Sequence, residues 1–379
     1  MKTYSTVLLG MGLFALQNAA LGANWQVIPS GNGPNQVNEL HAISALTEND
    51  AWAVGVSYNT ERTISNSLIE HWDGTQWSVV TSPNPSNTLN ILYGVAEVAA
   101  NDVWAVGFAA ATTSSAVIMH WNGSAWSVVR NPPGGIFMSN LMALAAVSAN
   151  DIWAIGSGRI GDEDATLTLH WNGTAWAFVP SPNVSPQVNN TLVGAAAVAT
   201  NDVWAVGAQQ PTSLTDPHTL ILHWDGSVWR IVSSPNDGGN TVGNHLLAAA
   251  AVSGNDVWST GYSELGTLSE HWDGTQWSVV PTPSSAGGNS APEFLPSVVA
   301  LSSNNVWSVG ESFDSRKSVS HTLTEQWAGT QWTVQKSPNV GSDHNELFGI
   351  DATPGGTLWA VGTTYRFPQQ RALIERKLP

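Results

Sequence analysis

The chain of 379 residues contains no cysteine. Disulfide bonds and a lipid-bearing cysteine anchor are therefore excluded, and the folded protein must be stabilised by packing alone. Beyond the N-terminal segment, no apolar run reaches the ~18 residues that a membrane-spanning helix needs. We therefore expect no membrane insertion.

Basic residues are scarce. The chain has 12 Lys and Arg against 28 Asp and Glu, which gives a net charge of −16, and only 11% of its residues are charged. A surface with this charge repels the phosphates of nucleic acids and the head groups of anionic membranes, so we expect neither as a partner. Neutral carbohydrates and protein surfaces are the expected ligands.

The N-terminus has the pattern of a secretory signal peptide. Lys2 precedes an apolar run from Val7 to Leu16, and small residues follow over Ala20–Ala23. A basic start, a short apolar run and a small-residue cleavage region are typical of such peptides. The pattern predicts a signal peptide over residues 1–23 and a secreted protein, extracellular or periplasmic, whose single domain spans residues 24–379.

Tryptophan is abundant, and all 20 Trp residues are in repeat register. A motif of the type Asn-Asp-Val-Trp-Ala-Val-Gly recurs seven times, 49 to 54 residues apart, with its tryptophans at Trp52, Trp104, Trp153, Trp204, Trp258, Trp307 and Trp359. A motif of the type His-Trp-Asp-Gly-Thr-x-Trp recurs six times, with the pairs Trp72/Trp77, Trp121/Trp126, Trp171/Trp176, Trp224/Trp229, Trp272/Trp277 and Trp327/Trp332. Trp25 matches the second half of this motif. A period near 50 residues with four short apolar segments predicts a β-propeller.

One repeat is interpreted as four β-strands. The expected strands of the first repeat are Leu40–Leu46, Ala51–Val56, Ser67–Trp72 and Gln76–Val80. Asp73–Gly74 separates the last two. Asp-Gly or Asn-Gly between two extended runs is a strong hairpin signal, because both central residues adopt positive φ.

The repeats do not fit evenly between the chain ends. The last repeat continues through Leu358–Gly362 to Ala372–Glu375 and stops before a fourth strand, whereas Trp25–Pro29 is an isolated fourth strand at the other end. Closing the ring with this strand removes sheet edges that would otherwise promote aggregation. We predict an all-β, seven-bladed β-propeller with four antiparallel strands per blade, whose last blade is closed by the N-terminal strand.

The repeat resembles the kelch-type repeats of galactose-oxidase-like propellers. The shared features are the period near 50, a glycine after the second strand such as Gly55, and an aromatic residue five positions before a tryptophan, such as Trp72 before Trp77. The sequence departs from the kelch pattern in having one glycine in place of a pair. The resemblance implies the architecture only. The Tyr–Cys copper cofactor of the kelch-fold oxidases is excluded because the chain lacks cysteine, and we expect no cofactor.

The expected connections between strands differ on the two faces of the ring. First-to-second and third-to-fourth connections are short, whereas second-to-third and fourth-to-first connections vary in length and composition, as binding loops do. Polar residues of the second-to-third connections are candidate ligand-binding residues: Arg62, Asp216, His218, Asp314, Arg316, His321, Tyr365 and Arg366. The fourth-to-first connections add Asp237, Glu293, Asp343, His344 and Glu346. Glu97 is also a candidate, because it replaces the alanine of the other six repeats on an innermost strand, where a carboxylate must face the channel or be paired.

Residues that recur in most repeats are predicted to be structural. The recurring histidines are separated by one repeat each and cannot converge on one metal ion, so we expect no metal site. The recurring aspartates are expected to cap turns. Asp162–Asp164 is interpreted as a solvated acidic loop in preference to a calcium site. Most tryptophans are expected between blades, with stacking of sugars on exposed tryptophans as the alternative.

The leading functional hypothesis is a secreted, non-enzymatic propeller that binds a glycan or another protein through its variable-loop face. The alternative is a polysaccharide-acting glycoside hydrolase or lyase, in which a hydrolase needs paired carboxylates about 5 to 10 Å apart. A purely structural envelope component is a third hypothesis. Near-identical repeats favour multivalent binding or a scaffold, whereas a cluster of unlike acids, arginine and tyrosine at one mouth of the channel favours an enzyme.

Overall fold

The computed structural model describes residues 24–35, 37–132, 137–160, 163–185, 188–211, 216–239, 242–283, 292–366 and 369–379. The described residues form strands, turns and connecting segments, with no α-helix among them. No helix in this part of the chain is long and apolar enough to cross a membrane. The predicted signal peptide, residues 1–23, lies outside the described residues.

The strands recur in a fixed order along the chain. The innermost strands are β2 (Val37–Thr47), β6 (Leu89–Ala99), β10 (Phe137–Ser148), β14 (Val188–Ala199), β18 (Asn244–Ser253), β22 (Glu293–Ser302) and β26 (His344–Ala352). The second strands are β3 (Asp50–Tyr58), β7 (Asp102–Ala110), β11 (Asp151–Ile160), β15 (Asp202–Pro211), β19 (Asp256–Ser263), β23 (Asn305–Asp314) and β27 (Leu358–Arg366). The third strands are β4 (Ser65–Trp72), β8 (Ser114–Trp121), β12 (Glu163–Trp171), β16 (His218–Trp224), β20 (Gly266–Trp272), β24 (Val319–Trp327) and β28 (Gln369–Lys377). The outer strands are β5 (Trp77–Val79), β9 (Trp126–Val129), β13 (Trp176–Phe178), β17 (Trp229–Val232), β21 (Trp277–Val279), β25 (Trp332–Gln335) and β1 (Gln26–Val27).

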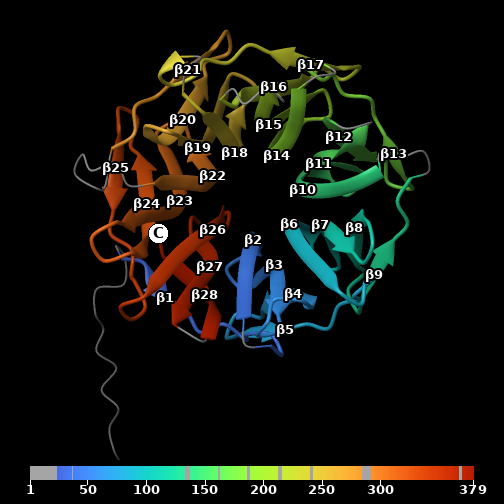
Figure 1. The fold of residues 1–379 in the computed structure, drawn as a ribbon, viewed down its shortest axis with the longest axis vertical. Coiled ribbons are helices and arrows are strands. Elements are labelled where there is room, and N and C mark those ends of the chain that lie inside the picture. Colours follow the sequence, from blue (N-terminus) through green and yellow to red (C-terminus); the bar gives the residue numbers. More distant parts are fainter. Residues whose placement is uncertain are drawn as a thin grey trace, which may run out of the picture.

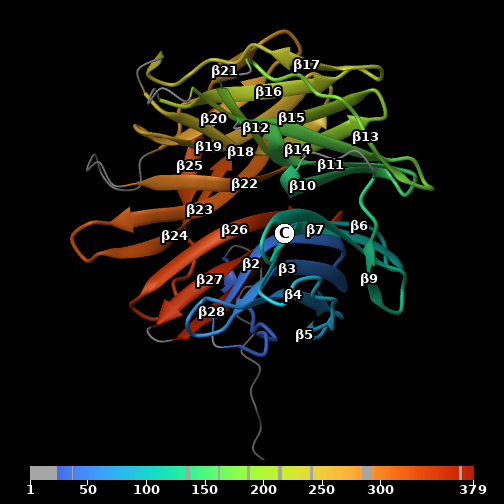
Figure 2. The same cartoon turned by 45° about the vertical axis from the view of Figure 1, so that its right-hand side comes forward.

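The strands form five antiparallel sheets of four strands and one sheet of eight. In the large sheet, β26, β27, β28 and β1 make one antiparallel run and β2 to β5 make another; a single parallel pair, Val37 with Gln370, joins them. The sheets lie around a central axis, with the innermost strand of each four-strand run beside it (Figure 1). After a 45° turn, neighbouring runs are seen packed against one another (Figure 2). The molecule is therefore a β-propeller, and we call each run of four strands a unit.

The N-terminal segment takes the place of an outer strand in the last unit. β1 pairs antiparallel with β28, and the Ile28 N–H donates to the carbonyl of Ile374 at 2.8 Å. Beyond β1, the Asn32 side-chain oxygen accepts the N–H of Ala372 at 3.2 Å. Asn84 makes the equivalent bond to the third strand of the first unit. The chain ends are thus joined by the same contacts that complete the other units.

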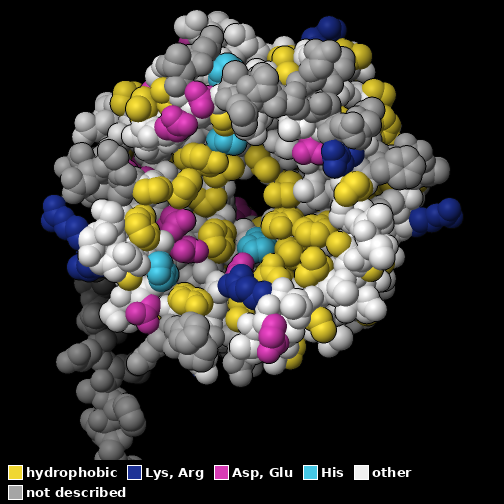
Figure 3. All heavy atoms as spheres, viewed as in Figure 1, with side chains coloured by type: hydrophobic (Ala, Val, Ile, Leu, Met, Phe, Trp, Pro, Cys, Tyr) yellow, Lys and Arg dark blue, Asp and Glu magenta, His cyan; other side chains and the backbone are white. Residues whose placement is uncertain are grey.

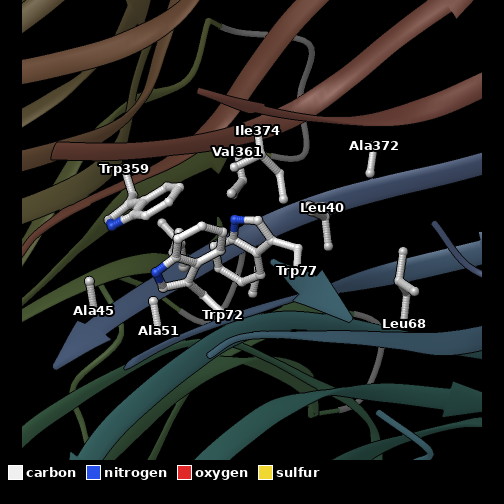
Figure 4. Packing of buried hydrophobic residues seen from close by; sticks show 12 residues of the cluster. Leu40, Ala45, Ala51, Leu68, Trp72, Trp77, Trp359, Val361, Ala372 and Ile374 are labelled. Atoms are coloured by element: carbon white, nitrogen blue, oxygen red, sulfur yellow. The ribbon is translucent and has the colours of Figure 1, made fainter. Parts of the chain in front are cut away.

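Tryptophans fill the spaces between units. Trp52 stacks on His71 of its own unit, with ring centroids 4.3 Å apart, and contacts Trp121 and Trp126 of the next unit at 5.1 and 5.4 Å. The same contacts recur where the last and first units meet: Trp359 lies against Trp72 and Trp77 (Figure 4). All 20 tryptophans lie in the described residues, and none is exposed. Fifteen of them are buried, and the other five are partly buried and packed against the core clusters: Trp121, Trp171, Trp224, Trp272 and Trp327.

The recurring histidines and aspartates pair with each other. In five units, a third-strand His Nε2 lies 2.7 to 2.8 Å from the Oδ1 of the Asp that begins the second strand. In the β22 unit, Gln326 and Asn305 make a neutral version of this bond at 3.1 Å. Among the described residues, no group of three His, Asp or Glu side chains is arranged to hold a metal ion. The prediction that these residues are structural agrees with this geometry.

One connection between a second and a third strand is shorter than the sequence predicted. Residues 158–165 were expected to be a loop, but β11 and β12 pair as far as Ile160 and Glu163. Asp164 therefore lies in a strand, which corrects the interpretation of Asp162–Asp164 as an acidic loop; Asp162 itself lies outside the described residues. Backbone hydrogen bonds continue the ladder past the apolar core, because they do not depend on side-chain polarity.

Four third strands carry a buried glutamate that the repeat pattern did not predict. Glu70, Glu270, Glu325 and Glu375 are fully buried, where the other three units have Met119, Leu169 and Leu222. Glu70 accepts hydrogen bonds from the Ser30 hydroxyl at 2.7 Å and from the Gly31 and Asn32 N–H groups at 2.9 and 3.1 Å. For the other three carboxyls, no donor of the described chain lies within hydrogen-bonding distance. Burial raises the pKa of Glu325 and of Glu375 to about 8, and the carboxylate of Glu293 adds to the shift at Glu325.

The substitution Glu325→Leu should stabilise the protein at alkaline pH. Because the pKa of Glu325 is raised from 4.5 to about 8, its protonated form stabilises the fold, and this stabilisation is lost as the pH rises through about 8. One pKa unit corresponds to about 1.4 kcal/mol, so a pKa raised from 4.5 to about 8 gives a gain at pH 9 of roughly 5 kcal/mol, with little change at pH 4. Melting temperatures of both proteins from pH 4 to 9 test this. Glu70→Leu is the matched control. It leaves the hydrogen-bond donors of residues 30–32 without an acceptor and should lower the Tm at every pH from 4 to 9. The same change in Tm for both variants at every pH would contradict this prediction.

Removal of residues 24–32 should destabilise the last unit. The deletion exposes one edge of β28, removes the buried Trp25 from its contact with Trp307, and leaves Glu70 without its donors. Losing a buried tryptophan alone costs about 3–5 kcal/mol. We expect a Tm at least 10 °C lower for a chain that starts at Gly33, measured by circular dichroism against a chain that starts at Asn24. An unchanged Tm would show that β1 does not contribute to the fold.

Candidate functional site

A channel runs along the axis of the propeller. Its cavity has a volume of about 400 Å³ and is lined by the innermost strands, mostly by alanine, glycine and other apolar residues. The charged or titratable residues that line it are His41, Tyr93, Glu97 and Asp351. The central hollow is visible in Figure 3, where hydrophobic side chains form much of its rim.

The two ends of the channel differ. Each innermost strand begins at the variable-loop face and ends at the short-loop face, so Glu97 and Asp351, near the ends of β6 and β26, lie towards the short-loop face. Burial raises the pKa of Glu97 to about 9, and the nearby carboxylate of Asp50 adds to this shift. Asp351 accepts the N–H groups of Ala45 and Ala352, each at 2.8 Å. Glu97 therefore lines the channel near its short-loop end, with both carboxyl oxygens buried, and does not lie at the mouth where the variable loops are.

A second cavity opens at the variable-loop face, where the first and last units meet. This seam pocket has a volume of about 410 Å³ and is lined by Glu39, Arg62, His344, Glu346, Phe348, Thr363, Tyr365 and Gln370. Four of the candidate residues, Arg62, His344, Glu346 and Tyr365, thus come together. Arg62 and Tyr365 are more than 300 residues apart in the sequence. Acidic, basic and histidine side chains gather beside the central hollow near β2 and β26 (Figure 3).

Arg62 joins the two units across the seam pocket. Its Nη2 lies 3.1 Å from Oε1 of Glu39 and donates to the side-chain oxygen of Gln370. Gln370 in turn donates to Glu39 Oε1 at 3.0 Å, which completes a three-membered network. The guanidinium lies 5.2 Å from the ring centroid of Tyr58, within range of a cation–π interaction. About half of the Arg62 side chain remains exposed.

Glu39 is held as a carboxylate. His41 Nδ1 donates to the carbonyl of Leu92 at 2.9 Å, and its Nε2 lies 3.4 Å from Glu39 Oε2. The His41 ring stacks on Tyr93, with centroids 5.1 Å apart, which fixes the orientation of the imidazole. Burial acts to raise the pKa of Glu39, but His41 and Arg62 together outweigh burial and lower the pKa.

The pKa of Glu346 is raised, whereas that of Glu39 is lowered. Burial raises the pKa of Glu346 to about 7, the carboxylate of Glu311 on β23 adds to the shift, and a hydrogen bond with Ser320 opposes it. The Ser320 N–H also donates to His344 Nδ1 at 3.1 Å, so this ring nitrogen is an acceptor. One pocket thus contains one acid whose pKa is lowered and another whose pKa is raised to about 7.

Glu39 and Glu346 occupy the same position in their repeats. Each immediately precedes the invariant leucine of its innermost strand, Leu40 or Leu347. At this position the other units have Ile91, Asn140, Thr191, His245 and Phe294. Each strand bulges just after this leucine, and a glycine of the next strand allows the close approach: a Cβ at Gly55 would lie 2.0 Å from the carbonyl oxygen of Glu39. Comparing the repeats position by position would have identified both acids, whereas a search confined to loops missed Glu39.

The other candidate residues do not reach the seam pocket. Asp314 accepts the N–H groups of Arg316 and Lys317 at 3.0 and 3.3 Å and closes an exposed turn. Asp216 lies just before β16, and His218 and His321 lie within β16 and β24, away from the pocket lining. The side chain of Arg366 lies outside the described residues, although its backbone pairs with Gln369. Glu39, Phe348, Thr363 and Gln370 line the pocket and were not among the candidates.

No protein family and no curated relative matches the chain by sequence. Several solved structures are similar in fold. YCF48 bound to D1 peptide has a TM-score of 0.58 and 14% identity over 96% of this chain and all of the other. The polysaccharide lyase Uly1 has a TM-score of 0.56 and 10% identity, covering 91% and 90%. The six-bladed, fucose-recognising lectin of the fungus Aleuria aurantia has a TM-score of 0.52 and 12% identity, covering 82% and 99%. At these identities the likenesses support a β-propeller fold, and the kelch resemblance still rests on the sequence motifs alone.

Proposed function

We propose that the protein binds a carbohydrate in the seam pocket. The observation that carries this proposal is the convergence of Arg62, Glu39, Glu346 and Tyr365 in one cavity at the mouth of the channel. Phe348 and Tyr365 offer faces for the apolar side of a sugar ring, and the charged groups offer donors and acceptors for its hydroxyls. Propellers of similar fold include a fucose-recognising lectin and a polysaccharide lyase, which is consistent with this ligand class.

A single site fits better than one site per repeat. The seam pocket depends on two acids that only the first and last units carry at this position, and none of the recurring tryptophans is exposed. We further propose that the eight-stranded sheet comprises two blades joined by one parallel pair, which gives a seven-bladed ring closed by the N-terminal strand.

The predicted signal peptide supports export of the protein. N-terminal sequencing of the exported protein checks this: a start near residue 24 is expected.

Arg62→Ala should weaken carbohydrate binding at least tenfold. The change removes a half-exposed guanidinium and releases Glu39 from its ion pair. A glycan array at two salt concentrations identifies the ligand, and calorimetry then measures its Kd. Arg316→Ala, which removes an exposed arginine from another loop on the same face, is the matched control and should leave the Kd unchanged. An array without any bound glycan would reject carbohydrate as the ligand and favour a protein ligand.

One observation favours hydrolysis as a second candidate function. Glu39 and Glu346 line the same pocket, and their pKa values are displaced in opposite directions, as those of a catalytic base and acid are. In this role Glu346 gives its proton to the glycosidic oxygen, and Glu39 takes a proton from the attacking water. Release of reducing ends from the bound polysaccharide, abolished in Glu346→Gln and in Glu39→Gln, would establish this activity. Binding without product release would leave the protein a lectin-like binder.

A further inference from the structure

Paired asparagines hold five of the connections between units. The first asparagine follows the outer strand and accepts an N–H of the third strand of its own unit, as Asn183 does from Thr166 at 2.9 Å. The second is buried two residues before the invariant leucine of the next innermost strand and accepts an N–H of the connection, as Asn190 does from Val184 at 3.0 Å. The five pairs are Asn32/Asn38, Asn84/Asn90, Asn183/Asn190, Asn236/Asn244 and Asn339/Asn345.

Two connections lack both asparagines. At the first position the sequence has Pro133 and Ser284, which lie outside the described residues, and at the second it has Ser139 and Glu293. A cavity opens at each of these two places: one of about 280 Å³ is lined by Ser139, and one of about 230 Å³ is lined by Glu293. Loss of the paired asparagines thus coincides with an opening between units, at equivalent positions three units apart.

The cavity at Ser139 lies at the variable-loop face, between the second unit (β6–β9) and the third (β10–β13). We call it the Ser139 pocket. None of the described residues that line it is charged. Leu167 and Leu169, both buried, contribute apolar surface from the third unit. Hydroxyl groups line it from Thr113, Ser114, Ser115 and Ser139.

Ser139 replaces the first asparagine as a hydrogen-bond acceptor but fills less space. Its Oγ accepts the Ala116 N–H of the third strand at 3.2 Å. Asn131, which also lines the pocket, donates from Nδ2 to the Ala116 carbonyl at 2.6 Å. The Asn131 Oδ1 is buried, and no donor of the described chain lies within hydrogen-bonding distance of it. A buried acceptor without a donor is destabilising, so a ligand that brings an O–H group to this oxygen gains affinity.

Met138 lines the same pocket with a strained backbone. Its φ of 49° lies in the left-handed region, which residues other than glycine, asparagine and aspartate rarely adopt. About half of its side chain is exposed. Residues held in this region cluster at ligand-binding sites, where the surrounding structure fixes them.

We propose that the Ser139 pocket is a second binding site, which takes one neutral sugar residue. The hydroxyl groups and Asn131 bind the hydroxyls of the sugar, and Met138, Leu167 and Leu169 contact the apolar face of its ring. The volume of about 280 Å³ is near the lower limit for ligand pockets and suits a single ring. A pocket without charged lining residues favours a neutral sugar over a uronic acid or an amino sugar, because neither charge would find a partner there. This site is additional to the seam pocket and differs from it in charge.

The methionines allow binding to be located directly. Three lie in the described residues: Met138 lines the Ser139 pocket, Met142 lines the channel, and Met119 is buried. The protein, isotope-labelled at its methionine methyl groups, is titrated with the methyl glycosides of glucose, galactose, mannose and N-acetylglucosamine and followed by nuclear magnetic resonance. At least one of these sugars should shift the Met138 signal to saturation and leave the Met119 signal unchanged.

A variant that restores the other units' residues tests the pocket itself. Ala116→Thr combined with Ser139→Asn introduces the larger side chains that most other units carry at these two positions, so the chain should fold with the pocket filled. The affinity measured from the Met138 shift should fall roughly tenfold or more, because the ring no longer fits. Arg62→Ala, which alters the seam pocket, is the matched control and should leave the Met138 titration unchanged. Melting curves establish that each variant is folded.

Two results would overturn this inference. The first is a Met138 signal that none of the four sugars shifts, or that shifts no more than the Met119 signal. The second is a titration of Met138 that the filled variant leaves unchanged. The seam pocket is tested separately, by the effect of Arg62→Ala on the glycan found with the array. A silent Met138 with binding that depends on Arg62 would reject the second site and retain the proposed function, and the reverse result would do the opposite.

Discussion

The fold depends on one contact that is repeated around the ring. In six units, the tryptophan of the second strand is held between a third-strand side chain of its own unit, a histidine in five of them, and two tryptophans of the next unit. Trp307 instead contacts Trp25 and Lys377 of the last unit. Large aromatic side chains supply both apolar area and a defined edge-to-face geometry, so the same contact sets the distance and the angle between adjacent sheets. The His–Asp bond orients the histidine, which lets a polar residue take part in an apolar interface without an unpaired ring nitrogen.

Strong packing between units leaves other positions free to vary. The third-strand position of Glu325 accepts methionine, leucine or a buried glutamate in different units, because the tryptophans fix the interface whatever occupies it. At Glu70 the N-terminal segment supplies the missing donors, and Gly31 donates an N–H where the other units have proline in the equivalent Ser-Pro segment. The first and last units are therefore joined by polar bonds in addition to aromatic packing.

The repeat made the architecture predictable from sequence, because every tryptophan lies in register and the hairpin dipeptides mark the outer turns. Arg62 and Tyr365 were predictable as site residues because they depart from the repeat in variable connections. Glu39 was not predictable as a site residue, because it lies within an apolar strand and next to Leu40, the leucine that every innermost strand shares. The meeting of Glu39 and Glu346 in one pocket depends on how the first and last units face each other, and no local pattern encodes that. The sequence also predicted some strand ends wrongly. At Asp164, the hydrogen-bonded ladder between β11 and β12 continues beyond the apolar core.

The seam combines stability with recognition. Arg62, Glu39 and Gln370 connect the first unit to the last, and the same three residues line the pocket. The segment from β1 in the last unit to β2 in the first unit crosses this junction, and the residues of the junction differ from those of the other interfaces. A ligand that contacts both sides of the junction gains affinity only when the ring is closed, so binding and closure are thermodynamically linked. A site built at the seam therefore exists in the folded ring alone, whereas a site within one repeat would survive partial opening of the propeller.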